Sequence, residues 1–138
     1  MIKLFISSHG HFASGLKSSV EILMGPNDRI TVFDAYVTQE SVQEHLDAFF
    51  ETVKPEDKVI MLSDLYGGSV NSVMYTYLTK PNTKLIAGVN LALVLELAVK
   101  EDISDEELEA LVEQSRMMLR VVEMEKAQEE ESNDEDFF

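Results

Sequence analysis

The sequence predicts an α/β fold, an open and mostly parallel sheet with helices on both faces. Short apolar runs alternate with helical segments over most of the chain, and a strand followed by a helix, repeated, favours parallel strands. The run Val59-Ile60-Met61-Leu62 is apolar at every position, which is typical of a strand buried on both faces. In such a sheet, ligands bind at the carboxyl ends of the strands.

The expected strands are short runs of β-branched and other apolar residues. Three of them are followed within three residues by a side chain that could take part in a reaction, namely His9, Asp34 or Asp64. A last run near the C-terminus also has strand character. The five strands are expected over residues 2–6, 30–33, 59–62, 85–89 and 119–124.

The segments between the strands carry apolar residues at spacings of three and four, as on one face of a helix. Gly25-Pro26 ends the first of these helices. Thr38 and Asn90 are placed as helix N-caps, and Ser104 with Glu107 forms a capping box. The five helices are expected over residues 12–24, 39–53, 67–80, 91–99 and 105–117.

The chain has 138 residues and 45% apolar residues, enough for one domain with its own core. We expect that domain over residues 1–126 and an acidic, disordered tail over residues 127–138. The net charge of −15 argues against nucleic acid and anionic membranes as partners. There is no cysteine, and no segment reaches the roughly 20 apolar residues of a membrane helix. A cytoplasmic, soluble protein is therefore expected.

Two corners between a strand and a helix carry side chains suited to phosphoryl chemistry. A histidine such as His9 can accept a phosphoryl group on an unprotonated ring nitrogen, and its neutral form is available near neutral pH. A carboxylate that holds the other ring N–H fixes the tautomer, and Asp64 is the candidate. The amides of Gly67-Gly68-Ser69, at a helix start, would donate to phosphate oxygens. Such a site needs no metal and no other cofactor.

Simpler interpretations of these residues stay open. A histidine before a glycine is most often a turn residue, Asp64 could serve only as a helix cap, and the glycine pair could serve only as a tight turn. His11 would suit a metal pair with His9, but no third ligand cluster is visible, so no metal site is expected.

Four markers resemble those of the EIIA domains of the mannose-type (mannose/fructose/sorbose) sugar phosphotransferase system, or PTS. They are Ser8-His9-Gly10, Asp34, Asp64-Leu65-Tyr66-Gly67-Gly68-Ser69 and Ala87-Gly88-Val89-Asn90. The resemblance runs from Met1 to about Lys126. Each marker alone is weak, whereas all four at the family's order and spacing are specific.

The resemblance implies a phosphocarrier enzyme, that is, a phosphotransferase. His9 would accept a phosphoryl group from phospho-HPr and pass it to an EIIB domain, and the sugar would be phosphorylated during uptake through membrane EIIC/EIID components. The protein would be a homodimer that exchanges the antiparallel strand Leu119–Met124 and associates peripherally with the transporter. The implied site comprises His9 and Asp64, phosphate-binding Gly67, Gly68 and Ser69, and supporting Ser8, Gly10 and Asp34.

The chain departs from the family pattern at three positions. The family often has proline where Val70 and Ala92 stand here. Proline at a first helical turn is favourable but not required, so activity is expected to survive these two changes. Leu65 replaces a hydroxyl residue of the better-known mannose member, which would remove a phosphate contact and leave more to the backbone amides.

Two alternative functions stay open. One is the phosphohistidine subunit of a phosphoenolpyruvate-dependent dihydroxyacetone kinase, in which we expect serine where Gly10 stands. The other is a non-catalytic, regulatory EIIA-like dimeric module. The resemblance implies that specificity for the sugar belongs to the EIIB partner and the membrane components.

Overall fold

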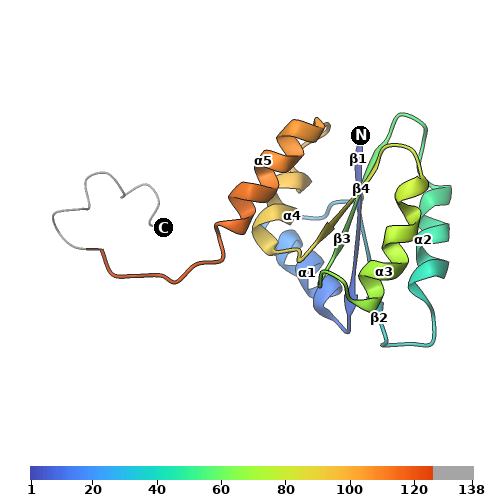
Figure 1. Cartoon of the computed structure of the whole chain (residues 1–138), viewed down its shortest axis with the longest axis horizontal. Coiled ribbons are helices and arrows are strands. Elements are labelled where there is room, and N and C mark those ends of the chain that lie inside the picture. The colour runs from blue at the N-terminus through green and yellow to red at the C-terminus, as the bar shows by residue number, and fades with distance from the viewer. Residues whose placement is uncertain (126–138) are drawn as a thin grey trace.

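Four parallel strands form one sheet in the order β2-β1-β3-β4 (Figure 1). The computed structural model describes residues 1–125. β1 lies inside the sheet, and its side chains are buried on both faces, as Phe5 and Ile6 illustrate. The predicted open, parallel α/β sheet is confirmed. The strands are β1 (Ile2–His9), β2 (Ile30–Ala35), β3 (Lys58–Ser63) and β4 (Thr83–Ala87).

Helices cover both faces of this sheet, as predicted (Figure 1). α1, α4 and α5 share one apolar core with one face of β1, whereas α2 and α3 share a second core with the other face. None of the helices within residues 1–125 is long and apolar enough to cross a membrane. The helices are α1 (Phe12–Met24), α2 (Val42–Glu51), α3 (Ser69–Tyr75) with the 3-10 helix η1 (Thr76–Thr79), α4 (Leu91–Ala98) and α5 (Asp105–Arg116).

Helix caps fix where the later helices begin. The Asn90 side chain accepts a hydrogen bond from the Leu93 amide at 3.0 Å, and Ser104 and Glu107 form the predicted capping box. The expected cap at Thr38 is wrong, because Ser41 accepts from the Glu44 amide at 3.1 Å and starts α2. The Thr38 hydroxyl instead accepts from the Glu40 amide, which makes a local turn before the helix.

The bounds of several other elements also differ from expectation, as α3 and β4 illustrate. α3 tightens into η1 after Tyr75, so the helical segment is less regular than predicted. β4 begins at Thr83 and ends at Ala87, because Gly88 has a φ of 76° and turns the chain out of the sheet. Positive φ values cost glycine little, so glycine is the usual residue for such a turn.

The C-terminal strand expected over Leu119–Met124 is not formed within the single chain, where residues 120–125 have no regular secondary structure. Four of its apolar side chains are largely exposed, and pairing inside this subunit therefore does not bury them. The acidic tail expected over residues 127–138 lies outside the described residues.

Asp57 links the start of the chain to the end of the segment before β3, and it should make stability depend on pH. Its buried carboxylate accepts hydrogen bonds from the Lys54 amide at 2.9 Å and from the Met1 ammonium at 3.3 Å. The Lys54 amide lowers the pKa of Asp57, and the Met1 ammonium adds to this although burial opposes it. The stability gained from this carboxylate is therefore complete above its ordinary pKa and lost as pH falls through the lowered pKa.

We expect Asp57→Asn to lower the free energy of unfolding at pH 7 by about 1–3 kcal/mol, the cost of weakening bonds to buried donors. Urea unfolding at pH 7 and pH 3 would measure this loss. The difference between wild type and variant should be smaller at pH 3, because the stability that ionised Asp57 contributes is lost as pH falls through its lowered pKa. A difference of the same size at both pH values would contradict the prediction.

Candidate functional site

The carboxyl ends of β1 and β3 meet at one edge of the sheet, where the chain order switches sides. β1 continues to β2 on one side, and β3 lies on the other, so the adjacent ends form a topological switch point. His9 is the last residue of β1, and Asp64 follows β3 directly. Gly10, with a φ of 63°, then turns the chain toward α1.

Asp64 holds His9 by two hydrogen bonds to the same carboxylate oxygen. The His9 backbone amide and ring Nδ1 each lie 2.9 Å from Asp64 Oδ2. Burial raises the pKa of Asp64, but the hydrogen bonds and charge of His9 outweigh this and hold that pKa below its ordinary value. Asp64 is therefore an ionised acceptor near neutral pH, and Nδ1 must carry the proton that it donates. In neutral His9, the lone pair is then on Nε2.

The start of α3 lies against that Nε2 atom. Ser69 Oγ is 3.2 Å from His9 Nε2. Gly67 has a φ of 75°, which allows the tight turn before the helix. A Cβ atom on Gly68 would lie 3.4 Å from His9 Cε1 and 3.3 Å from Leu65 Cβ, so glycine lets this loop approach the imidazole closely. Ser69 and Gly68 therefore lie beside the His9 ring, and Gly67 makes the turn that precedes them.

Ser8 supports the corner from inside. Its side chain is buried, accepts a hydrogen bond from the Ala13 amide at 2.7 Å and donates to the Gly10 carbonyl at 3.1 Å. These bonds tie the end of β1 to the first turn of α1. Ser8 thus shapes the backbone that carries His9.

Asp34 lies at the end of β2 but is committed to a second histidine. Its carboxylate accepts hydrogen bonds from the amide and hydroxyl of Ser14 at 2.9 and 2.5 Å, and it lies 3.0 Å from His11 Nδ1. Burial raises the pKa of Asp34, yet the bonds from Ser14 and His11 bring it below the ordinary value. The edge of the sheet therefore carries two separate imidazole–carboxylate pairs, of which only the His9 pair adjoins Ser69.

Tyr36 is a neighbour of His9 that the sequence did not reveal. Its ring stacks on the His9 ring, with centroids 5.3 Å apart and an angle of 27° between the planes. Its hydroxyl oxygen lies 2.7 Å from Ser69 Oγ. No sequence pattern signals this contact, because it depends on an unusual backbone turn after β2.

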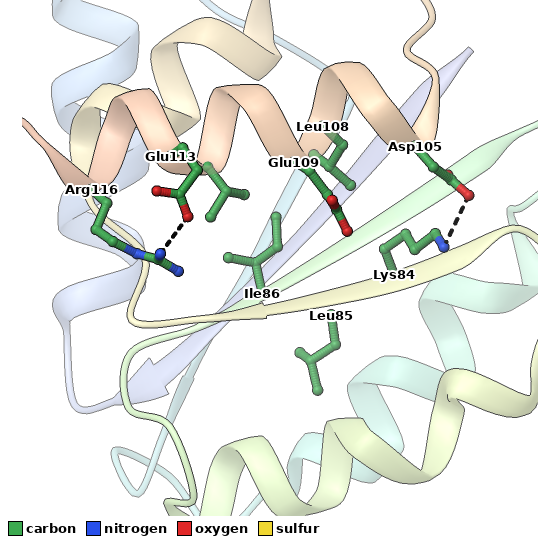
Figure 2. A pocket seen from close by; sticks show the side chains of 9 residues that line it. Lys84, Leu85, Ile86, Asp105, Leu108, Glu109, Glu113 and Arg116 are labelled. Carbon is green, nitrogen blue, oxygen red and sulfur yellow. Dashed lines mark hydrogen bonds and ion pairs between the residues drawn. The ribbon is translucent and has the colours of Figure 1, made fainter.

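The His9 side chain is 40% exposed, so the site is an open rim rather than a deep pocket. A groove of about 440 Å³ lies elsewhere, between β4 and α5. Figure 2 shows Ile86 on its floor and the ion pairs Lys84–Asp105 and Glu113–Arg116 along it. Within residues 1–125, no cluster of three or more histidine and carboxylate side chains could hold a metal ion. The arrangement at His9 suits a reaction on a ring nitrogen at an open rim of the sheet.

Known proteins are similar to this chain in both sequence and fold. The chain is 26% identical over 112 residues to the fructose-specific EIIA component of the PTS of Bacillus subtilis, covering 78% of this chain and 77% of that protein. It is 29% identical over 116 residues to the mannose-specific EIIAB component of Escherichia coli, covering 80% of this chain but only 36% of that longer protein.

Solved structures give the same result. The mannose/sorbose-specific IIA subunit from Enterococcus faecalis superposes with a TM-score of 0.77 at 25% identity, covering 90% of this chain and 96% of that one. The IIA protein associated with the fucose utilization operon of Streptococcus pneumoniae gives a TM-score of 0.71 at 28% identity, covering 87% and 92%. The family model described as the PTS system fructose IIA component matches residues 3–116. The chain belongs to this EIIA family of the sugar phosphotransferase system.

Proposed function

We propose that this chain is a phosphocarrier that accepts a phosphoryl group from phospho-HPr on Nε2 of His9 and passes it to an EIIB domain. The observation that carries the proposal is the pair of 2.9 Å contacts from His9 to Asp64, which leaves Nε2 as the unprotonated ring nitrogen. Family membership supports the choice of partners, because an EIIAB protein of Escherichia coli is a relative. The membrane EIIC/EIID components would be indirect partners.

The transfer requires no change in covalent bonding apart from the two N–P bonds. The Nε2 lone pair forms the new bond to phosphorus, and the bond to the donor histidine breaks and returns its electron pair to that ring. The Nδ1 proton stays between His9 and Asp64. The negative charge of Asp64 compensates the positive charge that the ring takes up, which lowers the barrier in the manner of a catalytic triad.

Hydrogen-bond donors near Nε2 would stabilise the transferred group. The Ser69 hydroxyl already lies 3.2 Å from Nε2 and can rotate toward a phosphoryl oxygen. The first amides of a helix have no acceptor inside that helix. α3 begins at Ser69, beside the imidazole, whereas the Gly68 amide already donates to the Leu65 carbonyl at 3.4 Å. Leu65 has no hydroxyl that could donate a hydrogen bond, so these donors would stabilise more of the negative charge of the phosphoryl group.

Phosphoryl transfer to the whole protein tests the proposal. We would combine the chain with phosphoenolpyruvate, enzyme I and catalytic HPr, and record its intact mass. One added phosphate that is labile to acid is expected, followed by its loss when an EIIB domain is added. Transfer only to the nucleotide subunit of a dihydroxyacetone kinase would favour the kinase alternative. No phosphate uptake in a mixture that phosphorylates a known EIIA would overturn the proposal in favour of a regulatory module.

We further propose that the chain is a homodimer in which Leu119–Met124 pairs antiparallel with the partner's β4. Within residues 1–125, β4 pairs on one side only, with β3, so an edge is available. The segment is exposed and apolar in the single chain, and edge strands of this kind readily pair with another chain. The groove between β4 and α5 lies along the same edge and offers Ile86 as an apolar floor (Figure 2).

Truncation at two points should therefore distinguish the effect of the exchanged strand from the effect of the tail. A chain that ends at Met118 should sediment as a monomer and unfold at a lower temperature, because it lacks the exchanged strand. A chain that ends at Glu125 is the matched control, since it retains the strand and should behave as the full chain does. Sedimentation equilibrium and thermal unfolding would measure both. A dimer that survives the cut after Met118 would refute strand exchange.

A further inference from the structure

Tyr36 has a backbone conformation that its side chain does not favour. Its φ is 66°, in the left-handed region, immediately after β2 ends at Ala35. Among residues 1–125 the only other non-glycine residue with positive φ is Asn82, and asparagine tolerates this region far better than an aromatic residue does. Strain of this kind persists where the surrounding structure enforces it, and it concentrates at functional sites.

The strained turn brings the tyrosine back over the active-site edge. Its ring stacks on His9 at 5.3 Å, and its hydroxyl lies 2.7 Å from Ser69 Oγ. Burial does not explain this position, because 68% of Tyr36 remains exposed. The turn thus brings Tyr36 into contact with His9, whose free ring nitrogen is Nε2, and with Ser69, which lies beside that nitrogen.

The positions of the protons give these contacts a direction. Nε2 of neutral His9 has no proton, so the Ser69 hydroxyl donates to it across 3.2 Å. The Ser69 oxygen is then free to accept, and the Tyr36 hydroxyl donates to it across 2.7 Å. Donation runs from Tyr36 to Ser69 to His9, and each bond in such a chain polarises the next. Tyr36 therefore aims the Ser69 hydroxyl at the reactive nitrogen.

We propose that Tyr36 is a positioning residue that covers Nε2 of His9 and, after phosphoryl transfer, shields the phosphohistidine from water. The inference rests on the proposed phosphocarrier function. When phosphorus replaces the hydroxyl of Ser69 at Nε2, that hydroxyl turns to a phosphoryl oxygen while Tyr36 still holds it. The stacked ring then limits the approach of a water molecule, whose attack on phosphorus would break the N–P bond and release phosphate.

The lifetime of the phosphoprotein tests this inference. Wild type, Tyr36→Phe, Tyr36→Ala and Tyr36→Gly would be phosphorylated, separated from enzyme I and HPr, and followed by intact mass. We expect roughly two- to tenfold faster hydrolysis in Tyr36→Ala, the effect of losing about one hydrogen bond, and an intermediate rate in Tyr36→Phe. Tyr66→Ala is the matched control, because Tyr66 is 90% exposed on the neighbouring loop and should not alter the lifetime.

Tyr36→Gly separates shielding from stability. Glycine accepts the positive φ without strain, so this variant should be more stable than Tyr36→Ala yet lose the phosphate equally fast. Lifetimes equal to wild type in both variants would overturn the inference. A lifetime that follows the thermal midpoint across the variants would also overturn it, because the effect would then be structural.

If the chain took up no phosphate, that result would refute the proposed function alone. A second measurement then still tests whether Tyr36 covers Nε2 of His9. Diethyl pyrocarbonate acylates unprotonated imidazole, and peptide mass spectrometry resolves its reaction at each histidine. Tyr36→Ala should speed the reaction at His9 and leave His11 unchanged, whereas Tyr66→Ala should change neither. Equal rates at His9 in wild type and Tyr36→Ala would show that Tyr36 does not cover Nε2.

Discussion

His9→Ala is expected to abolish phosphate uptake from phospho-HPr while the fold remains intact. Within residues 1–125, the imidazole provides the only ring nitrogen that lies beside Ser69 and is oriented by Asp64. Its side chain is 40% exposed at the end of β1, so its removal takes little packing from the core. Intact mass after incubation with phosphoenolpyruvate, enzyme I and HPr would measure the loss, and thermal unfolding would confirm that the variant folds.

His11→Ala is the matched control for that experiment. His11 is also an exposed histidine held by a carboxylate, but its partner is Asp34 and it adjoins α1 rather than Ser69. This variant should accept one phosphate as wild type does. If His9→Ala still gained phosphate and His11→Ala did not, the acceptor would be His11 and the assignment of His9 would be wrong.

The pairing of His9 with Asp64 was accessible from the sequence for a physical reason. Parallel strands place their carboxyl ends at one edge, so side chains that follow neighbouring strands come together even when the helices between them are long. Asp34 shows the limit of that reasoning. It lies at the end of β2, which also neighbours β1, but its carboxylate binds Ser14 and His11. The register between the two strands, which the sequence does not give, pairs Asp34 with Ser8 rather than with His9.

The errors have equally local causes. Thr38 and Ser41 are both residues that cap helices well. Ser41 is followed three residues later by Glu44, and a serine with glutamate at this spacing favours Ser41 as the cap. The contact between Tyr36 and His9 depends on the left-handed backbone conformation of Tyr36 itself, and a tyrosine does not signal such a conformation in the sequence. The strand expected over Leu119–Met124 stays a prediction, because residues 120–125 have no regular secondary structure in the single chain.

Asp64→Asn should lower the rate of phosphoryl transfer from phospho-HPr by roughly 10³- to 10⁴-fold, the loss seen when the orienting carboxylate of a catalytic triad becomes an amide. Asparagine keeps the size of the side chain but carries no charge. If its oxygen faces His9, the ring loses the negative charge that compensates phosphorylation. If its NH₂ group faces Nδ1, that atom becomes the acceptor, and the proton moves to Nε2 and removes the lone pair that attacks phosphorus.

Single-turnover transfer would measure the rate, and ¹⁵N chemical shifts of the His9 ring would identify the tautomer. The control is Asp57→Asn, which replaces another carboxylate that accepts a hydrogen bond from a backbone amide, at the amino end of β3 far along the sheet from His9. That variant is expected to lose stability but to transfer phosphate at the wild-type rate. A rate for Asp64→Asn within about tenfold of wild type, with Nδ1 still protonated, would mean that the backbone around His9 sets the tautomer and that the Asp64 charge contributes less than about 1.4 kcal/mol to the transition state.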